Sequence, residues 1–154
     1  MRTKWLKRLI IGGVAVFLLI QLVPYGRAHD NPPVTEAAKF PTHQGEDLMR
    51  QSCGDCHTNL TDWRWYSNIA PASWLVTSDV NGGREHLNFS EWNKPQPPLH
   101  ELIHRIQSGD MPPLKYTIPH PKAKLSSAEK KQLILDLTAL YKVDPPKIRI
   151  DHGD

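Results

Sequence analysis

The five residues Cys53-Gly54-Asp55-Cys56-His57 decide the fold of this 154-residue chain. Two cysteines separated by two residues and followed at once by histidine form the attachment signature of c-type haem. Cysteines three positions apart at a helix end can both reach the vinyl groups along one porphyrin edge, and the next residue is then carried to the iron. We therefore expect one covalent haem c, held by Cys53 and Cys56, with His57 as the proximal iron ligand.

Three other uses of a C-x-x-C pair are open: a thioredoxin-like redox pair, half of a zinc site and a lone structural disulfide. A thioredoxin-like pair needs a strand before its helix, and the flanking sequence lacks one. A zinc site would need a second cysteine pair, whereas the chain has only 2 cysteines. The histidine that follows the second cysteine directly favours haem.

The sixth iron ligand has to come from elsewhere, and Met111 is the only methionine after His57. It lies in the stretch SGDMPP, residues 108–113, where two prolines stiffen a loop. Methionine and histidine together raise the reduction potential of haem iron. Alternatives are a buried, gap-filling methionine, an open sixth site or a histidine ligand. The histidines in question are His86, His100, His104 and His120.

Helical signals surround these candidate ligands. Residues 46–51 form a short helix that leads into Cys53, and apolar side chains at helical spacing predict a second helix that Gly109 ends. Ser126 and Glu129 form a capping box that opens a third, amphipathic helix, which ends before Pro145. Because no strand-like alternation competes, we expect an all-α, small cytochrome c-like domain around one haem over residues 45–142.

The first 25 residues predict a membrane segment. Residues 9–23 carry no charge but are short for a span, which needs about 20 residues. Trp5 and Tyr25 bracket a helix of about 31 Å, with Lys7 and Arg8 at its cytoplasmic end. We expect a single-pass anchor over residues 1–25 in the cytoplasmic membrane, with the haem domain in the periplasm or outside the membrane. A cleaved signal peptide, cut near residues 26–28, is the alternative.

The remaining segments complete the domain organisation, and the net charge limits the classes of binding partner. Residues 26–44 read as a proline-rich linker and residues 143–154 as a polar tail. The net charge is +3, but Arg2, Lys4, Lys7 and Arg8 contribute four positive charges, which leaves −1 for residues 9–154. Since the body of the chain has no excess of basic residues, we expect no nucleic-acid partner.

Two aromatic-rich stretches lie between the candidate ligands: WRWYSNIAPASWL at residues 63–75 and DVNGGREHLNFSEW at residues 79–92. With CGDCH and the GDMPP loop, they resemble the haem-binding domain family of exported bacterial c-type cytochromes over about residues 30–142. The resemblance implies covalent haem c, a cytochrome c-like helical fold and electron transfer. We expect the aromatic side chains to line the haem pocket, with Tyr66, Arg84 or a tryptophan N–H on the haem propionates.

Three functions compete. The favoured one is a membrane-anchored mono-haem cytochrome that exchanges electrons with a redox partner protein. The alternatives are a haem enzyme or gas sensor with a labile sixth ligand, and a haem subunit of a larger respiratory complex. An electron carrier is favoured over an enzyme because Met111 is expected to occupy the sixth coordination position of the iron. In addition, the sequence has no acid–base constellation of peroxidase type.

Overall fold

A computed structural model describes residues 2–149 of the chain, and the regular secondary structure among them is helical, with no β-strand. Two isolated parallel bridges, Glu36 with Glu91 and Gln96 with Ile148, are the extended pairings there. The all-helical expectation is therefore confirmed. In chain order the helices are α1 (Arg2–Ile20), α2 (His43–Ser52), α3 (Gly54–His57), the 3₁₀ turn η1 (Trp65–Asn68), α4 (Ala72–His86), α5 (Leu99–Ser108), α6 (Leu114–Thr117), the 3₁₀ turn η2 (Pro121–Ala123) and α7 (Ser127–Val143).

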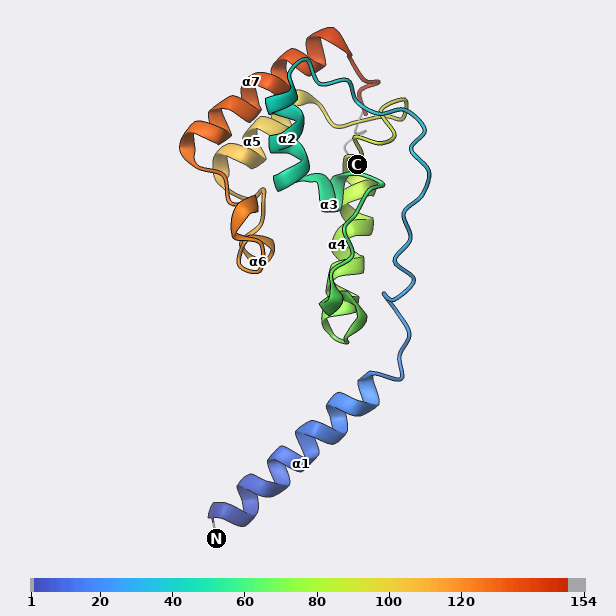
Figure 1. The fold of residues 1–154 in the computed structure, drawn as a ribbon, viewed down its shortest axis with the longest axis vertical. Coiled ribbons are helices and arrows are strands. Elements are labelled where there is room, and N and C mark those ends of the chain that lie inside the picture. The colour runs from blue at the N-terminus through green and yellow to red at the C-terminus, as the bar shows by residue number, and fades with distance from the viewer. Residues whose placement is uncertain (1, 150–154) are drawn as a thin grey trace, which may run out of the picture. The chain divides into compact units, whose positions relative to one another are not determined.

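The described chain divides into two compact units. One contains the residues up to Asp30 together with Trp63–Asp79, and the other contains Asn31–Asp62 together with the residues from Val80 onward. The second unit carries the attachment motif and Met111. In it α7 packs on α2 and α5, and the three helices lie side by side (Figure 1). Their shared core consists of buried apolar side chains: Leu48, Met49, Leu87, Phe89, Trp92, Leu102, Ile106, Leu125, Leu133, Leu137 and Leu140.

Side-chain caps fix the helices that position the site. Ser126 caps α7 by accepting from the Glu129 N–H at 3.3 Å, and Glu129 accepts from the Ser126 N–H at 2.8 Å. These bonds confirm the predicted capping box. The Ser126 hydroxyl also donates to the Glu129 carboxylate at 2.6 Å, and this bond, and secondly the one from the Ser126 N–H, lower the pKa of Glu129. Thr42 caps α2 by accepting from the Gly45 N–H, and its hydroxyl also donates to the buried Asp136 of α7 at 2.7 Å. One threonine thus starts α2 and joins it to α7.

The predicted end of α5 is confirmed as well. The helix stops at Ser108, and Gly109 follows in the left-handed conformation with φ of 85°. Glycine adopts this conformation at no steric cost, so it lets the chain reverse into the Met111 loop.

The N-terminal helix differs from the expectation. Within residues 2–149, no helix has both the length and the apolar character that a bilayer crossing needs. Helix α1 covers 19 residues, but its first seven carry four basic residues, and its uncharged part from Leu9 to Ile20 reaches only about 18 Å. The predicted transmembrane helix over residues 1–25 and the single-pass location in the cytoplasmic membrane are therefore wrong. The alternative of a cleaved signal peptide stays a prediction.

Contacts within the first unit explain why α1 stops at Ile20. The Gln21 side chain donates to the carbonyl of Ala70 at 2.8 Å and accepts from the N–H of Ala70 at 3.0 Å. This exchange holds the chain immediately after the helix, and Pro24 cannot extend it. From the sequence alone the helix is expected to reach Tyr25, because the apolar run continues past Ile20.

Candidate functional site

The C-x-x-C-H motif lies where α2 passes into α3. Cys53 ends α2, with its N–H donating to the Met49 carbonyl at 2.8 Å, and its own carbonyl accepts from the His57 N–H at 2.9 Å. Both cysteines are half-buried and are not joined in a disulfide. Burial, and secondly the charge of Cys56, raise the pKa of the Cys53 thiol to about 12, so this cysteine is protonated at neutral pH. The motif therefore presents two thiols and an imidazole within one turn of chain.

The imidazole of His57 is buried and held from one side. Its Nδ1 lies 3.0 Å from the carbonyl oxygen of Gly83 and 3.0 Å from that of Leu87. Because a carbonyl only accepts, Nδ1 carries the proton and Nε2 is left with its lone pair. None of the hydrogen bonds within residues 2–149 uses Nε2. Burial lowers the pKa of His57, against the opposing effect of the two carbonyls, and this favours the neutral form that a metal requires.

The Gly83 carbonyl lies in the last turn of α4 and the Leu87 carbonyl directly follows this helix, which approaches α3 closely at Gly83. A Cβ atom at position 83 would lie 2.9 Å from the Cys56 Cβ and would also overlap the Cys56 carbonyl oxygen. Only glycine allows this approach, and the approach brings the carbonyls within reach of His57. The Gly83 carbonyl also accepts from the Leu87 N–H at 2.9 Å, and because a carbonyl oxygen has two lone pairs, it can take the imidazole N–H as a second donor.

The loop after the motif is fixed by buried polar side chains. Asn88 donates to the Asn59 side chain at 2.8 Å, and the N–H of Asn59 donates to the Ser90 hydroxyl at 2.9 Å. Arg84 donates to the carbonyl of Thr58 at 2.9 Å and to the hydroxyl of Thr61 at 2.8 Å. These bonds join the residues that follow His57 to the end of α4 and so hold the imidazole in place.

Met111 lies in the loop between α5 and α6, and its side chain is 37% exposed. Its N–H donates to the Arg105 carbonyl at 3.1 Å, which secures the loop to the end of α5. In the described chain Met111 makes no hydrogen bond to the attachment motif. A connection is made further along the loop, where the Tyr116 hydroxyl of α6 donates to Asp55 at 2.7 Å.

The competing histidines have other surroundings. His86 lies 3.0 Å from the Glu101 carboxylate, and His120 stacks on Tyr116 with ring centroids 4.5 Å apart. His100 and His104 are exposed on α5. Among residues 2–149, no three His, Cys, Asp or Glu side chains are grouped as a metal site would require.

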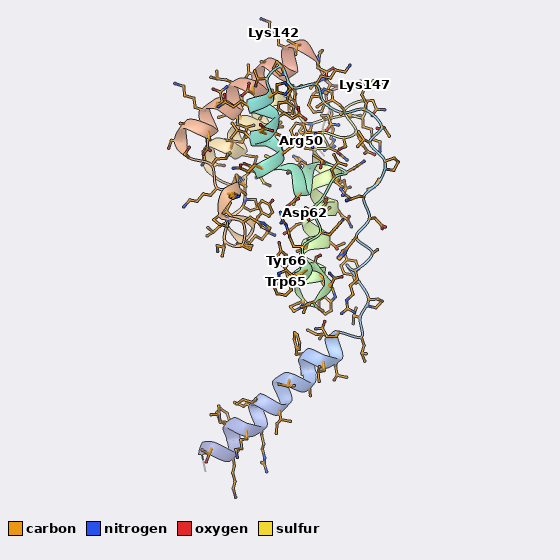
Figure 2. All side chains as sticks on the ribbon, in the orientation of Figure 1. Arg50, Asp62, Trp65, Tyr66, Lys142 and Lys147 are labelled. Carbon is orange, nitrogen blue, oxygen red and sulfur yellow. The ribbon has the colours of Figure 1, made fainter. Side chains whose placement is uncertain are left out.

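The aromatic residues between the candidate ligands differ in their surroundings. Trp92 belongs to the core, stacked on Phe89, and its N–H donates to the Asp144 carbonyl at 2.8 Å. Trp65 is 75% exposed and meets Tyr66 edge-on in η1, where Figure 2 labels both side chains. Trp74 has a buried N–H that finds no acceptor within the described residues. The contacts of Arg84 given above are all with the protein, and its expected role toward the propionates stays a prediction.

The donor set fits a haem. Two thiols that form no disulfide flank the start of α3, and a neutral imidazole beside them has its Nδ1 engaged and its Nε2 available, as a proximal ligand requires. The sequence identified these three residues but not the groups that orient them. Gly83, Leu87 and Tyr116 were missed; the adjacent glycines Gly82-Gly83, in a segment otherwise rich in large side chains, were the signal available for the close approach.

Comparison with known proteins agrees with this donor set. The profile of a protein family described as "Haem-binding domain" matches residues 15–138. No curated protein and no solved structure matches the chain. The family profile spans most of the sequence and includes both cysteines, His57 and Met111. The chain therefore belongs to the haem-binding domain family, and this membership indicates that it binds haem.

Proposed function

We propose that this protein is a mono-haem c-type electron carrier. In this proposal the thiols of Cys53 and Cys56 each add across a vinyl double bond, so that an S–C bond forms and the thiol proton passes to the other vinyl carbon. The two thiols at the α2–α3 junction, which form no disulfide with each other, support this step. Haem supplies the one-electron couple, and every other task falls to the residues of the chain.

The observation that carries the proposal is the hydrogen bonding of His57. Two backbone carbonyls fix the proton on Nδ1 and orient the ring, which leaves Nε2 to ligate iron. A histidine buried for packing alone would also need a donor for Nε2, and none of the hydrogen bonds within residues 2–149 supplies one. The acceptors also make the imidazole a stronger donor to metal, because they draw the Nδ1 proton away from the ring.

Met111 is the sixth ligand in the proposal. Its loop is closed by Gly109 on one side and stiffened by Pro112 and Pro113 on the other, and the Arg105 carbonyl holds the Met111 backbone. A thioether favours ferrous iron, and a filled coordination sphere leaves no site for peroxide or gas. These properties suit exchange of single electrons with a partner protein.

Two measurements test the proposal on protein matured with a cytochrome c assembly system. Mass spectrometry of the denatured chain should show one added haem, and the ferric protein should show the weak near-infrared band of an iron–thioether bond. Met111→Ala should abolish that band, whereas the matched control Met49→Leu, a volume-conserving change in the core, should keep it. A chain without bound haem after denaturation refutes covalent attachment. High-spin iron or rapid CO binding in the wild type refutes Met111 ligation and favours a haem enzyme or gas sensor.

A further inference from the structure

One hydrogen bond joins the Met111 loop to the haem-attachment motif. The hydroxyl of Tyr116, in α6, donates to the Asp55 Oδ2 at 2.7 Å across 61 residues of sequence. Asp55 lies between the two motif cysteines and two residues before His57, and Tyr116 lies five residues after Met111. The bond therefore links the segments that carry the two proposed iron ligands.

Asp55 is itself held firmly. Its Oδ1 accepts from the Asp62 N–H at 3.0 Å, and its backbone carbonyl accepts from the Thr61 hydroxyl at 2.6 Å. With one carboxylate oxygen engaged locally, the other is presented to Tyr116. A hydrogen bond to a carboxylate is stronger than one between neutral groups.

The Tyr116 side is ordered too. Its ring stacks on His120 at 4.5 Å with an interplanar angle of 25°. The loop between Gly109 and α6 is thus secured at both ends: the Met111 N–H binds the Arg105 carbonyl upstream, and Tyr116 binds Asp55 downstream. Leu114 and Ile118, on the other side of the same turn, are 73% and 72% exposed, so they add little packing that could replace the bond.

We propose that Tyr116 is a positioning residue that keeps Met111 on the iron by binding Asp55. This inference rests on the proposed function, in which Met111 is the sixth ligand. An external ligand reaches the iron only when the loop moves away, and that movement breaks the Tyr116–Asp55 bond. The apparent affinity for such a ligand falls with the fraction of protein whose loop is open. Removing the hydroxyl increases that fraction without altering either iron ligand.

The test is a titration of the ferric, full-length, haem-loaded protein with imidazole, followed by loss of the near-infrared iron–thioether band. We expect Tyr116→Phe to bind imidazole about tenfold more tightly than wild type, which corresponds to about 1.4 kcal/mol. Tyr141→Phe is the matched control, because it removes a tyrosine hydroxyl that donates to the Pro97 carbonyl at 2.8 Å. This control should lower the melting temperature and leave the imidazole affinity within twofold of wild type.

Asp55→Ala tests the bond from its acceptor side. It replaces Tyr116→Phe in the test if the Tyr116→Phe protein cannot be obtained in its haem-loaded form. It should also increase imidazole affinity, and adding Tyr116→Phe to it should have little further effect, because the two changes remove the same bond. Wild-type affinity in Tyr116→Phe, or additive effects in the double variant, overturns the inference. A wild-type protein that lacks the near-infrared band overturns the proposed Met111 ligation itself, and the two failures are therefore distinguishable.

Discussion

A single methyl group at position 83 should push the end of α4 away from the attachment motif. The added Cβ of Gly83→Ala would lie 2.9 Å from the Cys56 Cβ, whereas non-bonded carbons prefer about 3.5 Å or more. Relief of this contact needs a shift of about 0.6 Å, and relief of the tighter overlap with the Cys56 carbonyl oxygen needs a larger one. Along the direction to His57, a shift of about 0.6 Å would already stretch the Nδ1···O distance to the Gly83 carbonyl from 3.0 Å to about 3.6 Å, beyond hydrogen-bonding range.

The change in the free energy of unfolding caused by Gly83→Ala is the sum of three contributions. Overpacking costs about 1–3 kcal/mol, and the lost hydrogen bond costs about 0.5–1.5 kcal/mol. Alanine in place of a helical glycine returns about 0.5–1 kcal/mol. We expect the free energy of unfolding to fall by about 1–3 kcal/mol, measured by guanidinium titration of the haem-loaded protein. The reduction potential should rise, because a less basic His57 stabilises ferric iron less.

Gly82→Ala is the matched control. A Cβ at position 82 meets nothing within 4 Å, so this variant gains helix propensity without a clash. It should be more stable than wild type by about 0.5–1 kcal/mol, with an unchanged potential. If Gly83→Ala is as stable as Gly82→Ala and keeps the wild-type potential, the close approach of α4 does not support His57, and this account of the site is wrong.

Three further outcomes follow from the same contacts. Thr42→Ala should lower the free energy of unfolding by about 2 kcal/mol in urea titration, since it removes an N-cap and a donor to buried Asp136, while Thr42→Ser should stay near wild type. Burial raises the pKa of Tyr141 in the folded state, so stability should fall as the pH rises above 10.0, where unfolded tyrosine ionises. In Tyr141→Phe that alkaline decline should be smaller; an equal decline would assign it to other groups. Cys53→Ala and Cys56→Ala should each keep one thioether, whereas the double variant should release its haem on denaturation in acid, as the mass spectrum of the chain reports.

The sequence predicted those parts of the fold whose signals are local. The capping box at Ser126, the glycine at position 109 and the helix leading into Cys53 all depend on residues within one or two turns of each other. The attachment motif is local as well, which explains why three of the candidate site residues could be named at once. Met111 was singled out by elimination and by its prolines, and its role stays a proposal.

The sequence failed where distant residues decide the outcome. The apolar run after Arg8 suggests a long helix, but Gln21 binds the backbone of Ala70, 49 residues away, and the helix ends at Ile20. Helix α4 was not predicted, because two adjacent glycines lower helix propensity. The contact that requires glycine at position 83 is with Cys56, which is distant in the sequence. Tyr116 could not be chosen from the other tyrosines, since its partner is 61 positions earlier.

The support of His57 shows why the motif alone does not make the site. The C-x-x-C-H spacing delivers an imidazole to one position, but the ring can rotate and either nitrogen can carry the proton. The Leu87 carbonyl directly follows α4, and the Gly83 carbonyl, which already accepts from the Leu87 N–H, has a second lone pair. Both oxygens lie 3.0 Å from Nδ1 and fix the proton on that nitrogen. The glycine at position 83 makes this possible by letting α4 approach Cys56. The motif therefore identifies His57 as the proposed iron ligand, whereas the protonation and orientation of its ring are determined by Gly83 and Leu87, at the end of a helix that begins 15 residues later, at Ala72.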